Sequence, residues 1–188
     1  MESAPNGRRT YLLVDGENID ATLGTSLLSR RPTPEERPRW DRVTKYAEAS
    51  WNQPVTGLFF LNASSGQLPT HFVQALLAMG YRPVPLSGRA DQKVVDIGIQ
   101  RTLTALVEHD ADVFLCSHDG DFGPQMRALL DGERRVGVIA LREYASMEFS
   151  TLGIQIHDLE DEVGAFNVPL PRVRVIPLDE FDPERFLR

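Results

Sequence analysis

Short apolar runs alternate with amphipathic segments along most of the chain. The runs predict strands, and the segments between them carry apolar residues three and four positions apart, the spacing of one helix face. Predicted strands cover residues 10–14, 55–61, 81–86, 113–116, 135–140 and 154–159. Predicted helices cover residues 17–28, 40–51, 68–79, 91–107, 122–130 and 143–151. This alternation favours βαβ units, and therefore an α/β fold with a mostly parallel sheet covered by helices on both faces.

The pattern also divides the chain. Residues 1–9 are polar and predict a flexible leader, and residues 10–163 predict one globular domain, which the total length of 188 residues allows. Residues 164–188 change character, because prolines punctuate short apolar stretches. Prolines are poorly tolerated in central strands, so the alternation at residues 172–176 predicts an extended C-terminal arm or an edge strand.

Composition limits the classes of protein that fit. The formal net charge of −7 argues against a protein held on nucleic acid by bulk electrostatics alone. No apolar stretch approaches the length of a membrane span, so no membrane partner is expected. The single cysteine, Cys116, has no partner for an internal disulfide, which favours a reducing, cytoplasmic setting.

Carboxylates follow two of the predicted strands. Asp15 comes directly after the first strand, and Asp119 and Asp121 follow the strand at 113–116. Like charges so close repel one another and raise at least one pKa unless a cation shares them. The carboxyl ends of parallel strands meet at one edge of a sheet, where open α/β folds bind ligands. The predicted helix at 91–107 carries Lys93 and Asp96 on one face. We expect this face to lie over the same edge of the sheet.

Four carboxylates from separate segments suit a hard divalent cation. Magnesium and manganese prefer oxygen ligands, and such ions activate water, stabilise charge on a transferring phosphate and orient the scissile bond. The sequence contains no HExxH, paired CxxC, GxxxxGK[ST] or GxSxG motif. Zinc proteases, zinc ribbons, nucleotide kinases and serine hydrolases therefore lack their usual signatures here.

Three short motifs carry a resemblance to a known family. VDGEN at 14–18, KVVD at 93–96 and SHDGDF at 117–122 resemble, in order and spacing, the acidic motifs of the NYN domain, a branch of the PIN-like nuclease superfamily. The resemblance extends from residue 10 to residue 159. It implies a three-layer α/β/α sandwich of PIN type and a ribonuclease that cuts RNA phosphodiester bonds with Mg²⁺ or Mn²⁺. It leaves open whether the protein forms a homodimer.

The resemblance also implies roles for individual residues. The catalytic, metal-binding carboxylates would be Asp15, Asp96, Asp119 and Asp121. On the substrate side, Asn18 would shape the site, Ser117 would orient an aspartate or contact phosphate, and Lys93 would neutralise phosphate or the acidic cluster. His118 departs from the family pattern, in which a small residue is common. It is not an expected ligand, and a position facing the substrate is open to it.

Several of these residues also have simpler interpretations. Asp121 can act as the cap of the following helix, which carries Pro124 in its first turn, and Asp91 resembles the cap of the helix that contains Asp96. Lys93 and Asp96 can form a surface pair. Asp119 has no comparable structural explanation and is the strongest single candidate.

A loop rich in arginine and proline, residues 29–38, is the best candidate for contact with nucleic acid. The residues proposed to grip the RNA backbone are Arg30, Arg31, Arg37 and Arg39. Loops of this composition are also often merely solvated, and the sequence does not decide between the two interpretations.

Two other classes of function stay open at the level of sequence. One is a different acidic-site phosphoryl-transfer enzyme, of TOPRIM or haloacid-dehalogenase type. The first would need Glu17 as its catalytic glutamate, and the second would need Asp-x-Asp where this chain has Asp15-Gly16-Glu17. The other class is a non-catalytic RNA-binding or regulatory module, with the C-terminal arm as its contact to a partner.

Overall fold

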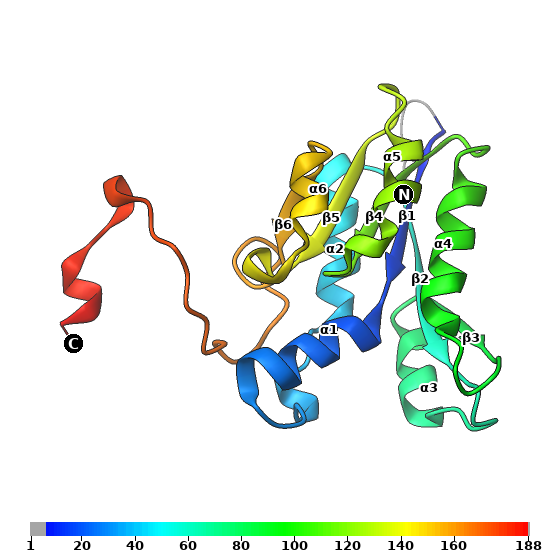
Figure 1. Cartoon of the computed structure of the whole chain (residues 1–188), viewed down its shortest axis with the longest axis horizontal. Helices are drawn as coiled ribbons and strands as arrows, with labels where there is room; N and C mark the ends of the chain where they lie inside the picture. Colours follow the sequence, from blue (N-terminus) through cyan, green and yellow to red (C-terminus); the bar gives the residue numbers. More distant parts are fainter. Residues whose placement is uncertain (1–6, 188) are drawn as a thin grey trace.

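One six-stranded parallel sheet forms the centre of the protein. The structure, a computed structural model, describes residues 7–187, so residues 1–6 of the predicted leader lie outside the described residues, whereas Arg9 already belongs to the first strand. The strand order is β3-β2-β1-β4-β5-β6 (Figure 1), and all five pairings are parallel. The strands are β1 (Arg9–Val14), β2 (Val55–Asn62), β3 (Arg82–Leu86), β4 (Ala111–Cys116), β5 (Val136–Ala140) and β6 (Gln155–Asp158).

Helices cover both faces of this sheet and give the predicted three-layer sandwich. On one side lie α1 (Gly16–Thr22), its continuation as a π-helix, η1 (Leu23–Leu28), α2 (Trp40–Trp51) and α3 (Thr70–Ala78). On the other side lie α4 (Val94–Leu106), α5 (Gly123–Leu129) and α6 (Met147–Thr151). No helix between residues 7 and 187 is long and apolar enough to cross a membrane.

The two cores follow from the alternation of side chains along each strand. In β1, Leu12 and Val14 pack with the first helix layer, and Leu13 packs with the second. All three are completely buried. A strand buried on both faces needs a continuous apolar run rather than an alternating one, which is the pattern that the central strands show.

The strand order changes direction between β1 and β4. From β1 the chain adds β2 and β3 on one side, and then crosses to add β4, β5 and β6 on the other side. In open α/β sheets, ligands bind in the crevice outside the carboxyl ends of the strands at this reversal. Asp15 follows β1 and Ser117 follows β4 directly, so the segments with the acidic motifs start at this position.

Helix α4 begins three residues later than the sequence pattern predicts. The interpretation of Asp91 as its cap is wrong, because the helix starts at Val94 and Lys93 occupies the N-cap position. The preceding residues form a separate turn, in which the backbone N–H of Arg89 donates to Gln92 Oε1 (3.0 Å) and Gln92 N–H donates to the Arg89 carbonyl (3.0 Å).

The C-terminal segment has a packed part and an exposed part. Val163 and Ala165 are buried against the first core, and the side chain of Arg172 is only 1% exposed. Beyond it, Val173 and Val175 are 91% and 98% exposed, and Figure 1 shows the chain leaving the domain. Between residues 159 and 187 the structure contains no strand, so the alternation at 172–176 belongs to an extended arm rather than to an edge strand.

Candidate functional site

Asp15 and Ser117 lie side by side because β1 and β4 are in register. Val14 pairs with Cys116, and the backbone N–H of Asp15 donates to the Cys116 carbonyl (3.0 Å). The Ser117 hydroxyl donates to Asp15 Oδ2 (2.8 Å). Both residues are buried, with 2% and 0% exposure. Ser117 therefore fixes the orientation of the Asp15 carboxylate. This is one of the two roles that the sequence left open for Ser117, the other being a contact with phosphate.

Hydrogen bonds continue from this pair along the loop after β4. Ser117 Oγ accepts from the backbone N–H of Asp119 (3.1 Å), and Asp119 Oδ1 accepts from the backbone N–H of Asp121 (2.9 Å). Asn18 Oδ1, from α1, accepts from the backbone N–H of His118 (2.8 Å). The loop is therefore held at both its first and its last acidic residue.

The prediction that Asp121 caps the following helix is wrong, and it is Asp119 that acts as a cap, of a turn that precedes this helix. A 3₁₀ turn, Gly120–Phe122, precedes α5, and Asp119 is its N-cap. The N-cap position of α5 is Phe122, without a side-chain cap. The inserted turn moves the cap two residues towards β4 and leaves the Asp121 side chain exposed to solvent. Asp119 thus has a structural role that the sequence did not indicate.

Asp96 completes the acidic group from the opposite helix layer. Its half-buried carboxyl has a raised pKa, because partial burial and repulsion from Asp119 and Asp121 disfavour its charge, while Lys93 opposes the shift. Carboxylates from α4 and from the loop after β4 are thus close enough to repel one another. Lys93, at the N-cap of α4, is exposed beside them.

Burial has a stronger effect on Asp15. It raises the pKa of this carboxyl to about 6, with a smaller contribution from the negative charges of Asp96 and Asp119, although the Ser117 hydroxyl opposes the shift. A buried carboxyl with carboxylate neighbours is costly to ionise, and a bound cation would remove this cost.

The donor set fits a hydrated divalent ion. As the side chains are oriented, no three His, Cys, Asp or Glu groups among residues 7–187 come together closely enough to hold one metal. Magnesium commonly keeps several waters and binds directly to one or two carboxylates, so the others can act through water. The carboxylates that would hold the ion are Asp15, Asp96, Asp119 and Asp121.

His118 does not face the substrate side, because it is only 5% exposed and lies between two other segments. Its Nε2 accepts from the backbone N–H of Leu141 (2.9 Å) at the end of β5. Its Nδ1 lies 3.0 Å from Thr22 Oγ1, so the neutral ring donates to this hydroxyl from α1. Burial lowers the pKa of His118 to about 4, which keeps the ring neutral. The sequence could not show this role, since both partners are distant along the chain.

Close backbone approaches explain the glycines in two of the motifs. A Cβ on Gly16 would lie 2.5 Å from Phe59 Cζ of β2, so only glycine lets α1 start directly after Asp15. A Cβ on Gly120 would overlap the Ser146 hydroxyl. Ser146 also donates its backbone N–H to the His118 carbonyl (3.0 Å), which ties the start of α6 to the acidic loop.

The four arginines proposed to grip RNA differ in their surroundings. Arg30 forms two hydrogen bonds with Glu36 (2.8 and 2.6 Å), and Arg37 binds Asp20 (2.6 Å). Arg31 and Arg39 are exposed, and within residues 7–187 neither has a carboxylate at salt-bridge distance. The loop therefore supplies fewer available charges than its sequence suggests.

Asp15→Asn is expected to stabilise the metal-free protein at neutral pH. The folded pKa of about 6 lies above the ordinary value of 3.8, so the folded protein binds this proton more tightly and loses stability as pH rises between these values. The asparagine cannot ionise and still accepts from Ser117. We expect a gain on the order of 2 kcal/mol at pH 7.5, measured by urea unfolding in EDTA, and no gain below pH 4. A loss of stability at pH 7.5 would contradict the assigned cost of ionising Asp15.

Comparisons with known proteins agree with this architecture. A family model described as the NYN domain matches residues 9–155. Among solved structures, a protein of unknown function from Vibrio parahaemolyticus aligns over 86% of this chain and 98% of its own, with a TM-score of 0.64 and 17% sequence identity. At that identity the likeness concerns the fold alone. No curated protein matches the chain.

Proposed function

Because the chain belongs to the NYN domain family, which is nuclease-like, we propose that it is a metal-dependent ribonuclease that hydrolyses RNA phosphodiester bonds. The observation that carries this proposal is that each of four acidic residues near the point where the strand order reverses lies within electrostatic reach of at least one of the others. Three separate segments supply them, and the pKa values of Asp15 and Asp96 are raised by burial and mutual repulsion. This arrangement lowers the stability of the metal-free protein, and such a cost is common at functional sites.

Each residue of the site then has a defined task. The four aspartates would hold Mg²⁺ or Mn²⁺, and the bound ion would activate water and stabilise charge on the phosphate. Ser117 orients Asp15, and Asn18 fixes the loop that carries Asp119. Lys93 lies beside Asp96, where it can attract a phosphate group to an otherwise acidic edge.

The TOPRIM alternative fits the geometry less well. Glu17, which a TOPRIM-type site would need, is exposed, and its Oε1 accepts from the backbone N–H of Asn62 (3.3 Å) at the end of β2. It is thus directed towards the neighbouring strand rather than the loop after β4.

The non-catalytic RNA-binding module has one observation in its favour, the spacing that keeps three acidic groups of residues 7–187 from meeting at one point.

One experiment separates these functions. Purified protein is incubated with a labelled single-stranded RNA in Mn²⁺, in Mg²⁺ and in EDTA, and its melting temperature is recorded in the same buffers. We expect cleavage only with metal, together with a higher melting temperature, because binding to the folded state stabilises it. RNA binding without cleavage in either metal would favour the non-catalytic module and overturn the proposed activity.

A further inference from the structure

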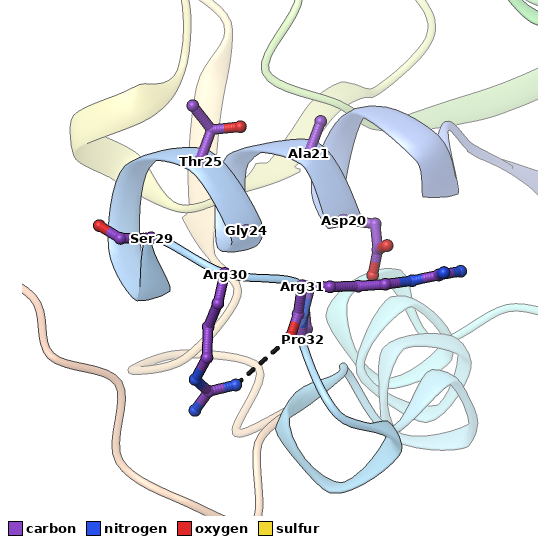
Figure 2. Close-up of a pocket in the computed structure, with 8 residues that line it drawn as sticks. All are labelled: Asp20, Ala21, Gly24, Thr25, Ser29, Arg30, Arg31 and Pro32. Atoms are coloured by element: carbon purple, nitrogen blue, oxygen red, sulfur yellow. Dashed lines mark hydrogen bonds between the residues drawn. The ribbon is translucent and has the colours of Figure 1, made fainter.

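A pocket of about 510 Å³ lies beside the helix that begins directly after Asp15. Its walls come from the end of α1, from η1 and from the arginine-rich loop, and Figure 2 shows the residues that line it. It is an open depression on the surface rather than an enclosed cavity. The residues that line it include two arginines, Arg30 and Arg31, and two residues with hydroxyl groups, Thr25 and Ser29.

A strained turn forms one side of this pocket. Ser29 has φ 53° and ψ 25°, a left-handed conformation that costs energy for a residue other than glycine. The turn is closed by the backbone N–H of Arg30, which donates to the Gly24 carbonyl (3.1 Å). It directs the following two arginines back beside the helix instead of away from the domain.

Arg31 supplies the free charge of the pocket. Arg30 is neutralised by Glu36, and Asp20, which also lines the pocket, is neutralised by Arg37. No carboxylate of residues 7–187 lies within salt-bridge distance of Arg31. In Figure 2 the two pocket arginines leave the loop in different directions, and the dashed line joins Arg30 Nη1 to the Arg31 carbonyl (3.3 Å). A locally positive pocket is notable in a chain of net charge −7.

We propose that this pocket binds a phosphate group of the RNA strand at a position flanking the scissile bond. The helix from Gly16 to Leu28 connects it to the acidic site, and Gly24 lies nine positions after Asp15, roughly 13 Å along the axis. A strand that places one phosphodiester at the acidic edge can therefore reach the pocket with a phosphate farther along the strand. The Arg31 guanidinium pairs with the phosphate oxygens. The inference rests on the proposed function.

Binding of a fluorescent single-stranded RNA, measured by anisotropy, tests the pocket without cleavage. The parent protein is the Asp119→Asn variant in Mg²⁺. Arg31→Glu is expected to weaken binding about tenfold, the size of one lost charge-assisted contact. Arg31→Ala should reduce the slope of log affinity against log salt concentration by about 0.7. The matched control is Arg82→Glu. Arg82 is exposed at the amino end of the edge strand β3, whereas the acidic site follows the carboxyl ends of central strands, so this change should leave binding unchanged.

A second variant is expected to tighten binding. Glu36→Gln frees Arg30 from its ion pair, and the glutamine can still accept from the backbone N–H of Thr33 as Glu36 does (2.9 Å). The turn is therefore preserved while the pocket gains a second available charge. We expect affinity for the same RNA to rise about threefold. Unchanged or weaker binding would contradict the assignment of Arg30 to the pocket.

The outcomes separate the pocket from alternative roles and from the proposed activity. Inorganic phosphate and a nucleoside monophosphate are added as competitors. If they compete while Arg31→Glu leaves RNA affinity unchanged, the pocket takes free phosphates and the proposal is overturned.

Arg31 lies close to the end of a helix, where a cation also stabilises the helix dipole. A lower melting temperature of Arg31→Glu with unchanged RNA affinity would therefore indicate that structural role and overturn the proposal. The proposal would also be overturned if the parent protein bound no RNA. Loss of binding in Arg31→Glu without cleavage by the wild type would leave the pocket standing and refute the nuclease. If the wild type cleaves RNA and Arg31→Glu leaves binding unchanged, the nuclease stands and the pocket is refuted.

Discussion

Replacing Asp119 with asparagine is expected to abolish metal-dependent cleavage of RNA while leaving the fold intact. Asp119 lies at the reversal of the strand order and electrostatically faces both Asp15 and Asp96. Changes to groups that only orient metal ligands cost 10–100-fold, so loss of a ligand should cost at least about 100-fold. The measurement is the cleavage rate of a labelled RNA in Mn²⁺, with the melting temperature recorded in Mn²⁺ and in EDTA.

The same variant tests whether the effect is chemical or structural. The asparagine Oδ1 can still accept from the backbone N–H of Asp121, so the cap of the 3₁₀ turn survives. We expect an unchanged or higher melting temperature in EDTA, because one repulsive charge near Asp96 is gone, and a smaller rise on adding Mn²⁺. Asp91→Asn is the control, since Asp91 is exposed outside the site. Retained cleavage by Asp119→Asn would exclude this carboxylate from the reaction.

The fold was predictable because local patterns in this chain agree with its tertiary structure. Each central strand is a continuous apolar run that ends in a turn or a polar motif, and α2 was predicted with its observed bounds, Trp40–Trp51. The start of α4 was not predictable, because it depends on which of several polar residues forms a side-chain bond. There Gln92 closes a turn with Arg89, and Asp91 is left outside the helix.

The site was predictable only in part. Sequence shows which carboxylates follow which strands, and parallel pairing then puts Asp15 beside Ser117. Sequence does not show long-range side-chain partners. His118 is held by Thr22 and by Leu141, and Arg30 is neutralised by Glu36 within a turn whose shape depends on Ser29. Such pairings decide which polar residues are available to a ligand, and only the folded chain reveals them.

The clearest long-range pairing that the sequence did not reveal surrounds Arg172, which anchors the C-terminal arm. Its Nε and Nη2 donate to the two oxygens of Glu143 (2.6 Å each), and its Nη1 and Nη2 donate to those of Asp158 (2.9 and 2.6 Å). Nη1 also contacts Glu160 (3.0 Å). Burial alone would raise the pKa of Asp158, but the bonds from Arg172 and from backbone N–H groups hold it well below its usual range. The hydrogen bonds from Arg172 also lower the pKa of Glu143.

Arg172→Gln is expected to lower the free energy of unfolding by about 3 kcal/mol at pH 7, because removing one partner leaves buried carboxylates without a cation. Arg174→Gln is the matched control. Arg174 binds Glu160 and Asp161 at the surface (2.5 Å each), where such pairs contribute less than about 1 kcal/mol. Urea unfolding gives both values, and limited proteolysis reports release of the arm. Equal effects of the two variants would refute the anchoring role.

Acid should remove the difference between wild type and Arg172→Gln. The carboxyl pKa values of Asp158 and Glu143 are lower in the folded protein than in the unfolded chain. Their ionisation therefore stabilises the fold fully above about pH 4, the unfolded value, and less as pH falls further. Unfolding free energies of the two proteins should converge below that pH, with the arm of the wild type becoming sensitive to acid-active proteases. A difference that persists undiminished at pH 2 would show that packing of the Arg172 stem, rather than its charge, holds the arm on the domain.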